Sequence, residues 1–243
     1  GPAAIAYNLD GVDKLTLNPQ VLAGIFDSKI TTWNDPAIAR LNPGITLPAT
    51  AIKPVHRSDS SGTTDNFQRF LQRAAPDAWP YEHSKEFQGK GGSGAAKSTG
   101  VGDTVKKSPG AITYVEWGFA TENDLGIAAV DFGAGPVELN ADSAGKALDG
   151  VKFKTPGSKD LVVDTDALFA SKAAGAYPLV LTPYSIVCSA GYDDSQISST
   201  LKEAFTKILD EGQEGLGALG YVPLPDGFKT TLKTTIDALD AGA

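Results

Sequence analysis

Residues 56–67 read HRSDSSGTTDNF, and this stretch marks a change from strand to helix. The preceding residues 52–56 follow a proline-punctuated segment and are typical of a strand that runs into the motif. The apolar residues that follow recur at helical spacing, which predicts an amphipathic helix of about three turns. Ser60 and Ser61 are its candidate N-caps, because a hydroxyl oxygen can accept a hydrogen bond from a first-turn N–H group. The stretch therefore predicts a strand that leads directly into a helix.

The donors in this stretch are suited to binding an anion. A helix N-terminus presents unpaired N–H groups and a partial positive charge. Gly62 permits close backbone approach, and the hydroxyls of Ser61 and Thr63 add donors. Arg57 supplies a planar fork suited to a tetrahedral oxyanion, and Asp59 is placed to hold the guanidinium and offset its charge. The residues alone leave open a plain helix cap beside a surface Arg–Asp pair.

Strand and helix patterns alternate along the rest of the chain, which indicates an α/β architecture. Further strands are expected at residues 3–9, within 108–120, near 127–130 and at 176–188. Further helices are expected to start at Asn18-Pro19 and at Asn34-Asp35-Pro36, near 103–107 and 143–148, and over about 194–210 and 226–239. The strongest β signal is 176–188, AYPLVLTPYSIVC, and the glycine-rich residues 88–102 are predicted to form a surface loop.

Composition limits the kinds of partner. The 243 residues, 41% of them hydrophobic, can bury a core in one large domain or two lobes. A formal net charge of -8 argues against binding to long nucleic acid, for which a basic face is expected. The most apolar windows, such as residues 177–187, are far shorter than the ~20 residues that a membrane-spanning helix needs. An anion site must therefore be built from local groups.

The cysteine and histidine content indicates neither a disulfide nor a metal site. Cys188 is the only cysteine, which excludes an intramolecular disulfide within these residues and a cysteine-based zinc site. We expect Cys188 to be a core residue of its strand. The two histidines, His56 and His83, lack a spacing that suggests metal ligation. No motif indicates a cofactor.

The motif resembles a known family. Arg57-Ser58-Asp59-Ser60-Ser61-Gly62-Thr63-Thr64 is similar to the R-[SA]-D-x-S-G-T signature of the periplasmic-type phosphate-binding proteins that feed the high-affinity phosphate ABC transporter. Further segments match in the family's order: Ile5-Ala6-Tyr7-Asn8, Leu15-Thr16-Leu17, Val21-Leu22-Ala23-Gly24-Ile25-Phe26, Ile30-Thr31-Thr32-Trp33-Asn34-Asp35-Pro36, Leu41-Asn42-Pro43-Gly44, Gly110-Ala111-Ile112-Thr113-Tyr114-Val115-Glu116-Trp117 and Tyr177-Pro178-Leu179. The resemblance covers essentially the whole chain.

The resemblance implies a fold and a site. The fold would be α/β and two-lobed, of the class II periplasmic-binding-protein type, with mixed sheets flanked by helices and two crossing hinge strands. Residues 1–6 would form one hinge strand, 7–176 the second lobe with the anion site, and 177–243 the return strand and the C-terminal part of the first lobe. By position in the motif, the implied phosphate ligands are Arg57, Ser61, Gly62 and Thr63, and Asp59 supports the arginine.

The resemblance also implies a cellular role. The protein would bind inorganic phosphate outside the cytoplasm and deliver it to a membrane-embedded ABC permease, without catalysis and without nucleic acid. In Gram-positive relatives a lipidated cysteine upstream anchors the protein, so a surface lipoprotein is expected. Family members carry roughly a further third of the chain upstream of Tyr7-Asn8, including an aspartate that accepts the proton of phosphate.

Other functions were weighed from particular residues. A phosphatase or hydrolase would use Ser61 or Thr63 as nucleophile, but the nearest candidate base, His56, is offset from the motif by the alternation of the strand. A surface adhesive or antigenic protein without a transport role is a further alternative. Residues 91–98 nearly match a P-loop, but Ala96 replaces its second glycine and no hydrophobic strand precedes it. The three tryptophans are scattered over unrelated segments, which favours packing over a sugar-binding platform.

Overall fold

A five-stranded mixed sheet forms the centre of the molecule. The computed structural model describes residues 1–239, so the last four residues of the segment expected over 177–243 lie outside the described residues. The strand order is β4-β3-β5-β1-β6, with β3 parallel to β4 and β5, and β1 antiparallel to β5 and β6. The strands are β1 (Ala3–Asn8), β3 (Lys53–Arg57), β4 (Ser93–Ala95), β5 (Ala111–Glu116) and β6 (Gly126–Ile127). The expected α/β class with mixed sheets and flanking helices is confirmed.

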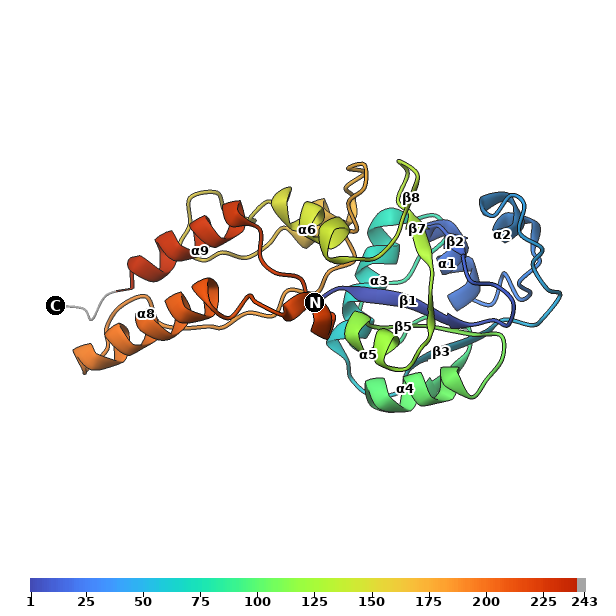
Figure 1. Cartoon of the computed structure of the whole chain (residues 1–243), viewed down its shortest axis with the longest axis horizontal. Helices are drawn as coiled ribbons and strands as arrows, with labels where there is room; N and C mark the ends of the chain where they lie inside the picture. The colour runs from blue at the N-terminus through green and yellow to red at the C-terminus, as the bar shows by residue number, and fades with distance from the viewer. Residues whose placement is uncertain (240–243) are drawn as a thin grey trace.

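Helices cover both faces of this sheet (Figure 1). They are α1 (Pro19–Phe26), α3 (Gly62–Ala74), α4 (Lys97–Lys106) and α5 (Trp117–Glu122), while α2 (Pro36–Leu41) lies off this sheet, against β2 (Thr16–Leu17). The α3 face is filled by aromatic side chains, with Phe26 packed edge-on against Phe67 at a centroid distance of 4.9 Å. On the α4 face, Val55 of β3 packs with Val101 and Val105. Strands β1 and β5 are therefore buried over all but their last residue, because helices shield both faces of the sheet from water.

Local capping signals set the starts of α1 and α2, as predicted. The side chain of Asn18 accepts a hydrogen bond from the N–H of Val21 at 2.9 Å, and that of Asp35 accepts one from Ala37 at 2.8 Å. In each helix a proline follows the cap, where its missing N–H costs nothing. Trp33, predicted to be a packing residue, is fully buried.

A small second sheet has the order β2-β7-β8 and comprises β2 (Thr16–Leu17), β7 (Ala129–Asp131) and β8 (Pro136–Val137). The strand expected near residues 127–130 is split between the two sheets. Its middle residue, Ala128, donates its N–H to the carbonyl oxygen of Ile5, and the chain then turns to pair with β2. Helices α6 (Ala141–Asp149) and α7 (Thr165–Phe169) follow.

The surface loop predicted over residues 88–102 is wrong in its second half. Residues 93–95 form β4, which pairs in parallel with β3, and α4 begins at Lys97, well before the helix expected near 103–107. Gly92 has a φ of 92° and lies against the carbonyl of Pro54, so no other residue fits there. The glycines therefore allow close approach to β3, and a phosphate-wrapping loop is not formed because one residue separates strand from helix.

The strand predicted over residues 176–188 is also wrong. Its first part lies beside the N-terminus, where Pro2 and Val180 form an isolated bridge, but the rest has no regular structure. Among the described residues no strand pairs with 181–188, so the β-forming side chains have no ladder to join. The expectation that Cys188 is buried is wrong for the same reason, because its side chain is exposed.

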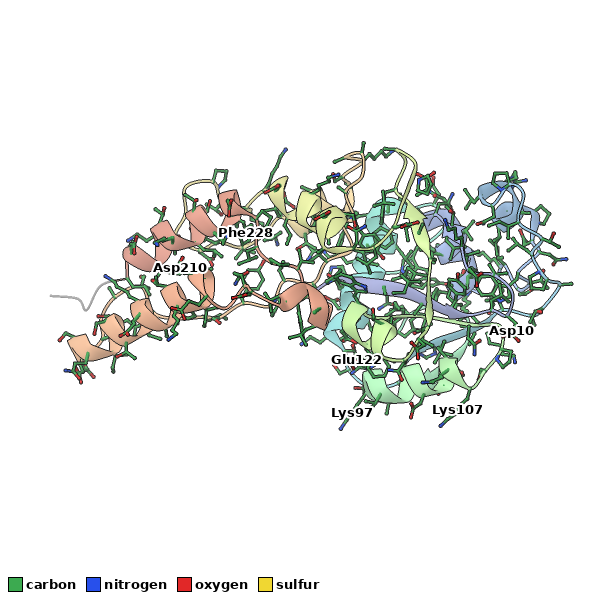
Figure 2. All side chains as sticks on the ribbon, viewed as in Figure 1. Asp10, Lys97, Lys107, Glu122, Asp210 and Phe228 are labelled. Atoms are coloured by element: carbon green, nitrogen blue, oxygen red, sulfur yellow. The ribbon has the colours of Figure 1, made fainter. Side chains whose placement is uncertain are left out.

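The last part of the described chain extends away from the sheet as a C-terminal arm, residues 181–239 (Figure 1). Both helices expected here are confirmed: α8 (Ser195–Asp210) and α9 (Asp226–Asp237), linked by the 3-10 helix η1 (Leu216–Leu219). Phe228 of α9, labelled in Figure 2, packs against Phe153 at a centroid distance of 5.7 Å. The arm also leaves large apolar side chains exposed, among them Ile186 at 95%.

Candidate functional site

The motif occupies the junction between β3 and α3, as predicted. Strand β3 ends at Arg57, and α3 starts at Gly62 with Ser61 as its N-cap. The Ser61 side-chain oxygen accepts from the N–H of Thr64 at 3.4 Å, which decides between the two expected caps. Because the first N–H groups of a helix have no intrahelical acceptor, those of Gly62 and Thr63, which precede the capped N–H of Thr64, face the end of the helix at which a ligand can bind. Ser61 and Thr63 are nearly buried.

Neither the backbone conformation nor the packing of the chain explains why residue 62 is a glycine. A Cβ built on Gly62 would have no atom within 4 Å, and the φ of this residue is not positive. The glycine is therefore needed neither for backbone conformation nor for close packing of this chain on itself. It leaves an unfilled approach to the N-terminus of α3.

Arg57 is held by Asp59 in a two-pronged ion pair. Nε of Arg57 donates to Oδ1 of Asp59 at 2.8 Å, and an Nη donates to Oδ2 at 2.6 Å. The hydrogen bond to Asp59 raises the pKa of the guanidinium. Hydrogen bonds from Arg57 and then from the backbone N–H of Lys97 hold the pKa of the Asp59 carboxyl well below its usual range. The remaining guanidinium nitrogen lies 3.4 Å from Oγ of Ser98.

The start of α4 thus belongs to the site, which sequence reasoning missed. The N–H of Lys97 donates to Oδ1 of Asp59 at 2.9 Å, so a second helix N-terminus fixes the aspartate. Figure 2 labels Lys97 at this end of α4, on the outer side of the molecule. No local sequence signal marks this contact, because the glycine-rich composition of residues 88–102 favours a loop.

Two residues of β5 complete the site, and both were missed. Tyr114 places its hydroxyl 2.8 Å from Oγ1 of Thr64 and accepts the backbone N–H of Arg57 at 3.4 Å. Glu116 accepts a hydrogen bond from Oγ1 of Thr63 at 2.9 Å. Burial raises the pKa of Tyr114, so its hydroxyl stays protonated and can donate and accept at neutral pH. Only the segment Gly110–Trp117, noted for its resemblance, marked these residues.

The two histidines have other partners. The ring of His56 stacks on Phe87 at a centroid distance of 4.1 Å, and its Nδ1 lies 3.0 Å from the carbonyl oxygen of Arg57. Nδ1 of His83 lies 2.7 Å from a carboxylate oxygen of Asp65. His56 is therefore packed into the side of the site and is not arranged as a base for Ser61.

Further features of the described chain lie away from this junction. Within residues 1–239 no group of three or more histidine, cysteine or acidic side chains is placed to hold a metal ion. No helix in the same range has the length and apolarity to cross a membrane. Two cavities of about 350 and 400 Å³ are lined by other residues, the first including Arg73 and Lys172, the second Asp10 and Asp124.

Comparison with known proteins gives consistent matches. Residues 1–209 match the family model described as the PBP superfamily domain. The chain is 46% identical over 241 residues to phosphate-binding protein PstS 3 of Mycobacterium tuberculosis, covering 98% of this chain and 65% of that protein. It is 34% identical to phosphate-binding protein PstS of Xylella fastidiosa, covering 93% of this chain and 61% of the relative. The chain thus spans less than two thirds of the length of these relatives.

Solved structures match in fold. One is a high affinity periplasmic phosphate-binding protein bound with phosphate, with a TM-score of 0.68 and 24% identity over 96% of this chain and 68% of that one. Another is the ancestral soluble variant of the human phosphate binding protein, with a TM-score of 0.67 and 21% identity over 100% of this chain and 75% of that one.

Proposed function

Since this chain belongs to the PBP superfamily domain family, we propose that the full-length protein binds inorganic phosphate outside the cytoplasm and delivers it to an ABC permease. The relatives at 46% and 34% identity carry the name phosphate-binding protein, which confirms the resemblance drawn from the motif. A lipid anchor upstream of the present residues is part of the proposal. Neither a nucleic acid nor a metal is required.

The phosphate would lie against Arg57, Ser61, Gly62 and Thr63, with Asp59 as support. The observation that carries this assignment is the Arg57–Asp59 pair beside the N-terminus of α3, where a Cβ on Gly62 would meet nothing. A guanidinium fork, hydroxyls and helix N–H groups are complementary to the oxygens of a tetrahedral anion. Because Asp59 cancels one charge, selectivity would come from the geometry of the donors more than from net positive charge.

The lobes are proposed with the boundaries expected from the sequence. Residues 1–6 and the start of 177–243 would be the two crossing segments, the second without regular strand structure, and 7–176 the lobe that carries the site. In support, the N–H of Ala3 donates to the carbonyl of Leu179 at 2.9 Å, so the two segments run side by side where the arm leaves the sheet. Closure of a second lobe over Gly62 would bury the anion.

Binding without turnover is favoured over hydrolysis. The hydroxyl of Thr63 donates to a carboxylate, and the only histidine in the motif stacks on an aromatic ring. A nucleophile needs a base within hydrogen-bond reach that accepts its proton during attack, and a carboxylate is a weak base for an alcohol. Incubation with a chromogenic phosphoester should give no product, and turnover lost in Ser61→Ala or Thr63→Val would contradict the proposal.

Calorimetric titration of the full-length protein tests the binding proposal. Phosphate should bind, sulfate should bind more weakly, and Arg57→Ala should weaken phosphate binding about 30-fold or more, because a charge-assisted contact worth ~2 to 4 kcal/mol is lost. Arg69→Ala is the matched control. Arg69 lies on the same helix α3 but away from its N-terminus, and it pairs with Asp166 of α7, so affinity should be unchanged. Equal losses in both variants, or no heat with phosphate, would overturn the proposal.

A further inference from the structure

Glu116 holds one of the donors assigned to the anion. Its Oε1 accepts the hydrogen bond from Oγ1 of Thr63 at 2.9 Å. Thr63 is 7% exposed and belongs to the first turn of α3, while Glu116 is the last residue of β5 and is exposed. Opposite Glu116 on β1 stands Ala3, and the N–H of Trp117 donates to the carbonyl of Pro2. The carboxylate thus lies between the first turn of α3 and the segment where the arm joins the sheet.

The chemistry of a hydroxyl makes this contact exclusive. A threonine side chain carries a single O–H proton, and a carboxylate can only accept. While Oγ1 of Thr63 donates to Glu116, it has no proton to donate to an anion at the N-terminus of α3. An anion that uses the Thr63 hydroxyl must therefore displace the carboxylate as acceptor.

The negative charge of Glu116 is expected to lower the affinity of the site for an anion. Arg57 is paired directly with Asp59, and this hydrogen bond, with a smaller contribution from the charge of Glu116, raises the pKa of the guanidinium. Asp59 is neutralised by two hydrogen bonds from the guanidinium and one from the N–H of Lys97. Glu116 accepts from a neutral hydroxyl in the site, so its charge opposes an incoming anion more directly than that of Asp59.

We propose that Glu116 is a positioning residue that competes with the anion for the Thr63 hydroxyl and sets the affinity of the site. Without a bound anion, Glu116 keeps the Thr63 hydroxyl paired and fixes the rotamer of Thr63. On binding, the hydroxyl turns its proton from Glu116 to an oxygen of the anion, with no proton transferred. The inference rests on the proposed phosphate function and names a residue that acts through Thr63.

The test measures a gain of affinity, which a damaged fold does not produce. Glu116→Gln retains an amide oxygen that can accept from Thr63 but removes the charge. In the full-length protein it should bind phosphate about three- to tenfold more tightly by calorimetry, because a neutral acceptor competes less well than a carboxylate. In a Thr63→Val background, which has no hydroxyl to exchange, the same substitution should give a clearly smaller gain.

The matched control is Glu122→Gln at the far end of the short helix α5, which follows Glu116 directly. Glu122 is exposed, and Figure 2 labels it beside α5. The substitution Glu122→Gln removes the same charge at a residue that does not contact Thr63, so the affinity for phosphate should stay within about twofold of the wild type. An unchanged or weaker affinity in Glu116→Gln, a gain equal to that of Glu122→Gln, or a gain that persists fully in the Thr63→Val background would overturn the inference. If the wild type itself fails to bind phosphate, the proposed function falls and the inference with it.

Discussion

Tyr114 joins the end of one strand to the start of one helix. Its hydroxyl contacts the backbone N–H of Arg57 and Oγ1 of Thr64, and its ring stacks on Phe67 at a centroid distance of 4.3 Å. Burial raises the pKa of this phenol, so it remains neutral at the pH of most environments. One buried side chain therefore fixes the spacing between the arginine and the helix N-terminus that the proposed site depends on.

Tyr114→Phe should lower the free energy of unfolding by about 1 kcal/mol, because loss of the hydroxyl removes the partner of the buried Thr64 hydroxyl and of the partly buried Arg57 N–H. Phosphate affinity should fall about threefold or more, since the first turn of α3 is no longer tied to Arg57. Tyr7→Phe is the control, because the buried Tyr7 hydroxyl donates to the carbonyl of Val12 away from the site. Urea unfolding and calorimetry should show similar destabilisation in both variants and weaker binding only in Tyr114→Phe. The same affinity in both would show that Tyr114 has no positioning role.

Helix α3 is fastened at its far end by an ion-pair network with α7. Asp166 of α7 accepts hydrogen bonds from Arg69 at 2.8 Å and from Arg73, both on α3. The bond from Arg69 is the main cause that lowers the pKa of Asp166 to about 2. Arg69 and Arg73 therefore act as a structural anchor between α3 and α7.

The Asp166 anchor predicts a defined acid sensitivity. An aspartate has a pKa near 3.9 when unfolded, so the stabilising contribution is complete above about pH 4 and is lost as the pH falls towards 2. Asp166→Asn should lower stability at pH 7 by about 0.5 to 1 kcal/mol, because the pair is partly exposed. Its unfolding free energy should vary less than that of the wild type between pH 4 and pH 2.

Asp10→Asn is the matched control for this measurement, because Asp10 is an exposed aspartate at the end of β1 (Figure 2). It should reproduce the wild-type pH dependence. If Asp166→Asn keeps the full loss of stability between pH 4 and pH 2, the network does not hold α3 to α7.

The C-terminal arm touches the sheet region through two glycines. Gly220, after η1, has a φ of 74°, and a Cβ there would lie 2.1 Å from the Cα of Gly118 in α5. The obstacle is backbone, which cannot rotate aside as a flexible side chain does. This contact therefore sets how closely the arm approaches the start of α5, next to Glu116 and the proposed crossing strands.

Gly220→Ala should lower the free energy of unfolding by about 1 to 3 kcal/mol. The alanine would have to adopt a left-handed backbone conformation, and its Cβ would clash with the backbone of Gly118. The arm should become more sensitive to limited proteolysis than the sheet, because η1 is displaced from α5. Gly217→Ala, inside the neighbouring 3-10 helix η1, is the control, because the nearest atom to a Cβ there is 4.0 Å away. Equal stability and equal cleavage in the two variants would contradict the importance of this contact.

Much of the local structure was predictable because its causes lie within a few residues. The Asn18-Pro19 and Asp35-Pro36 pairs cap and start their helices, and the motif forms a strand followed by a helix as its pattern indicates. Such signals depend on hydrogen bonds between residues two or three apart, which any context preserves. The Arg57–Asp59 pair is of the same kind, since the two residues are two positions apart.

The sequence alone determined the α/β class, the strand-to-helix motif with its donor set, and the family resemblance. Only the tertiary structure decided that residues 93–95 form a strand and that 181–188 do not, because a strand exists only where another strand accepts its hydrogen bonds. It likewise decided that Glu116 and Tyr114 belong to the site, since they lie 53 and 50 positions from the threonines they contact. Contacts over such distances are chosen by the packing of helices on the sheet, and no local periodicity encodes them.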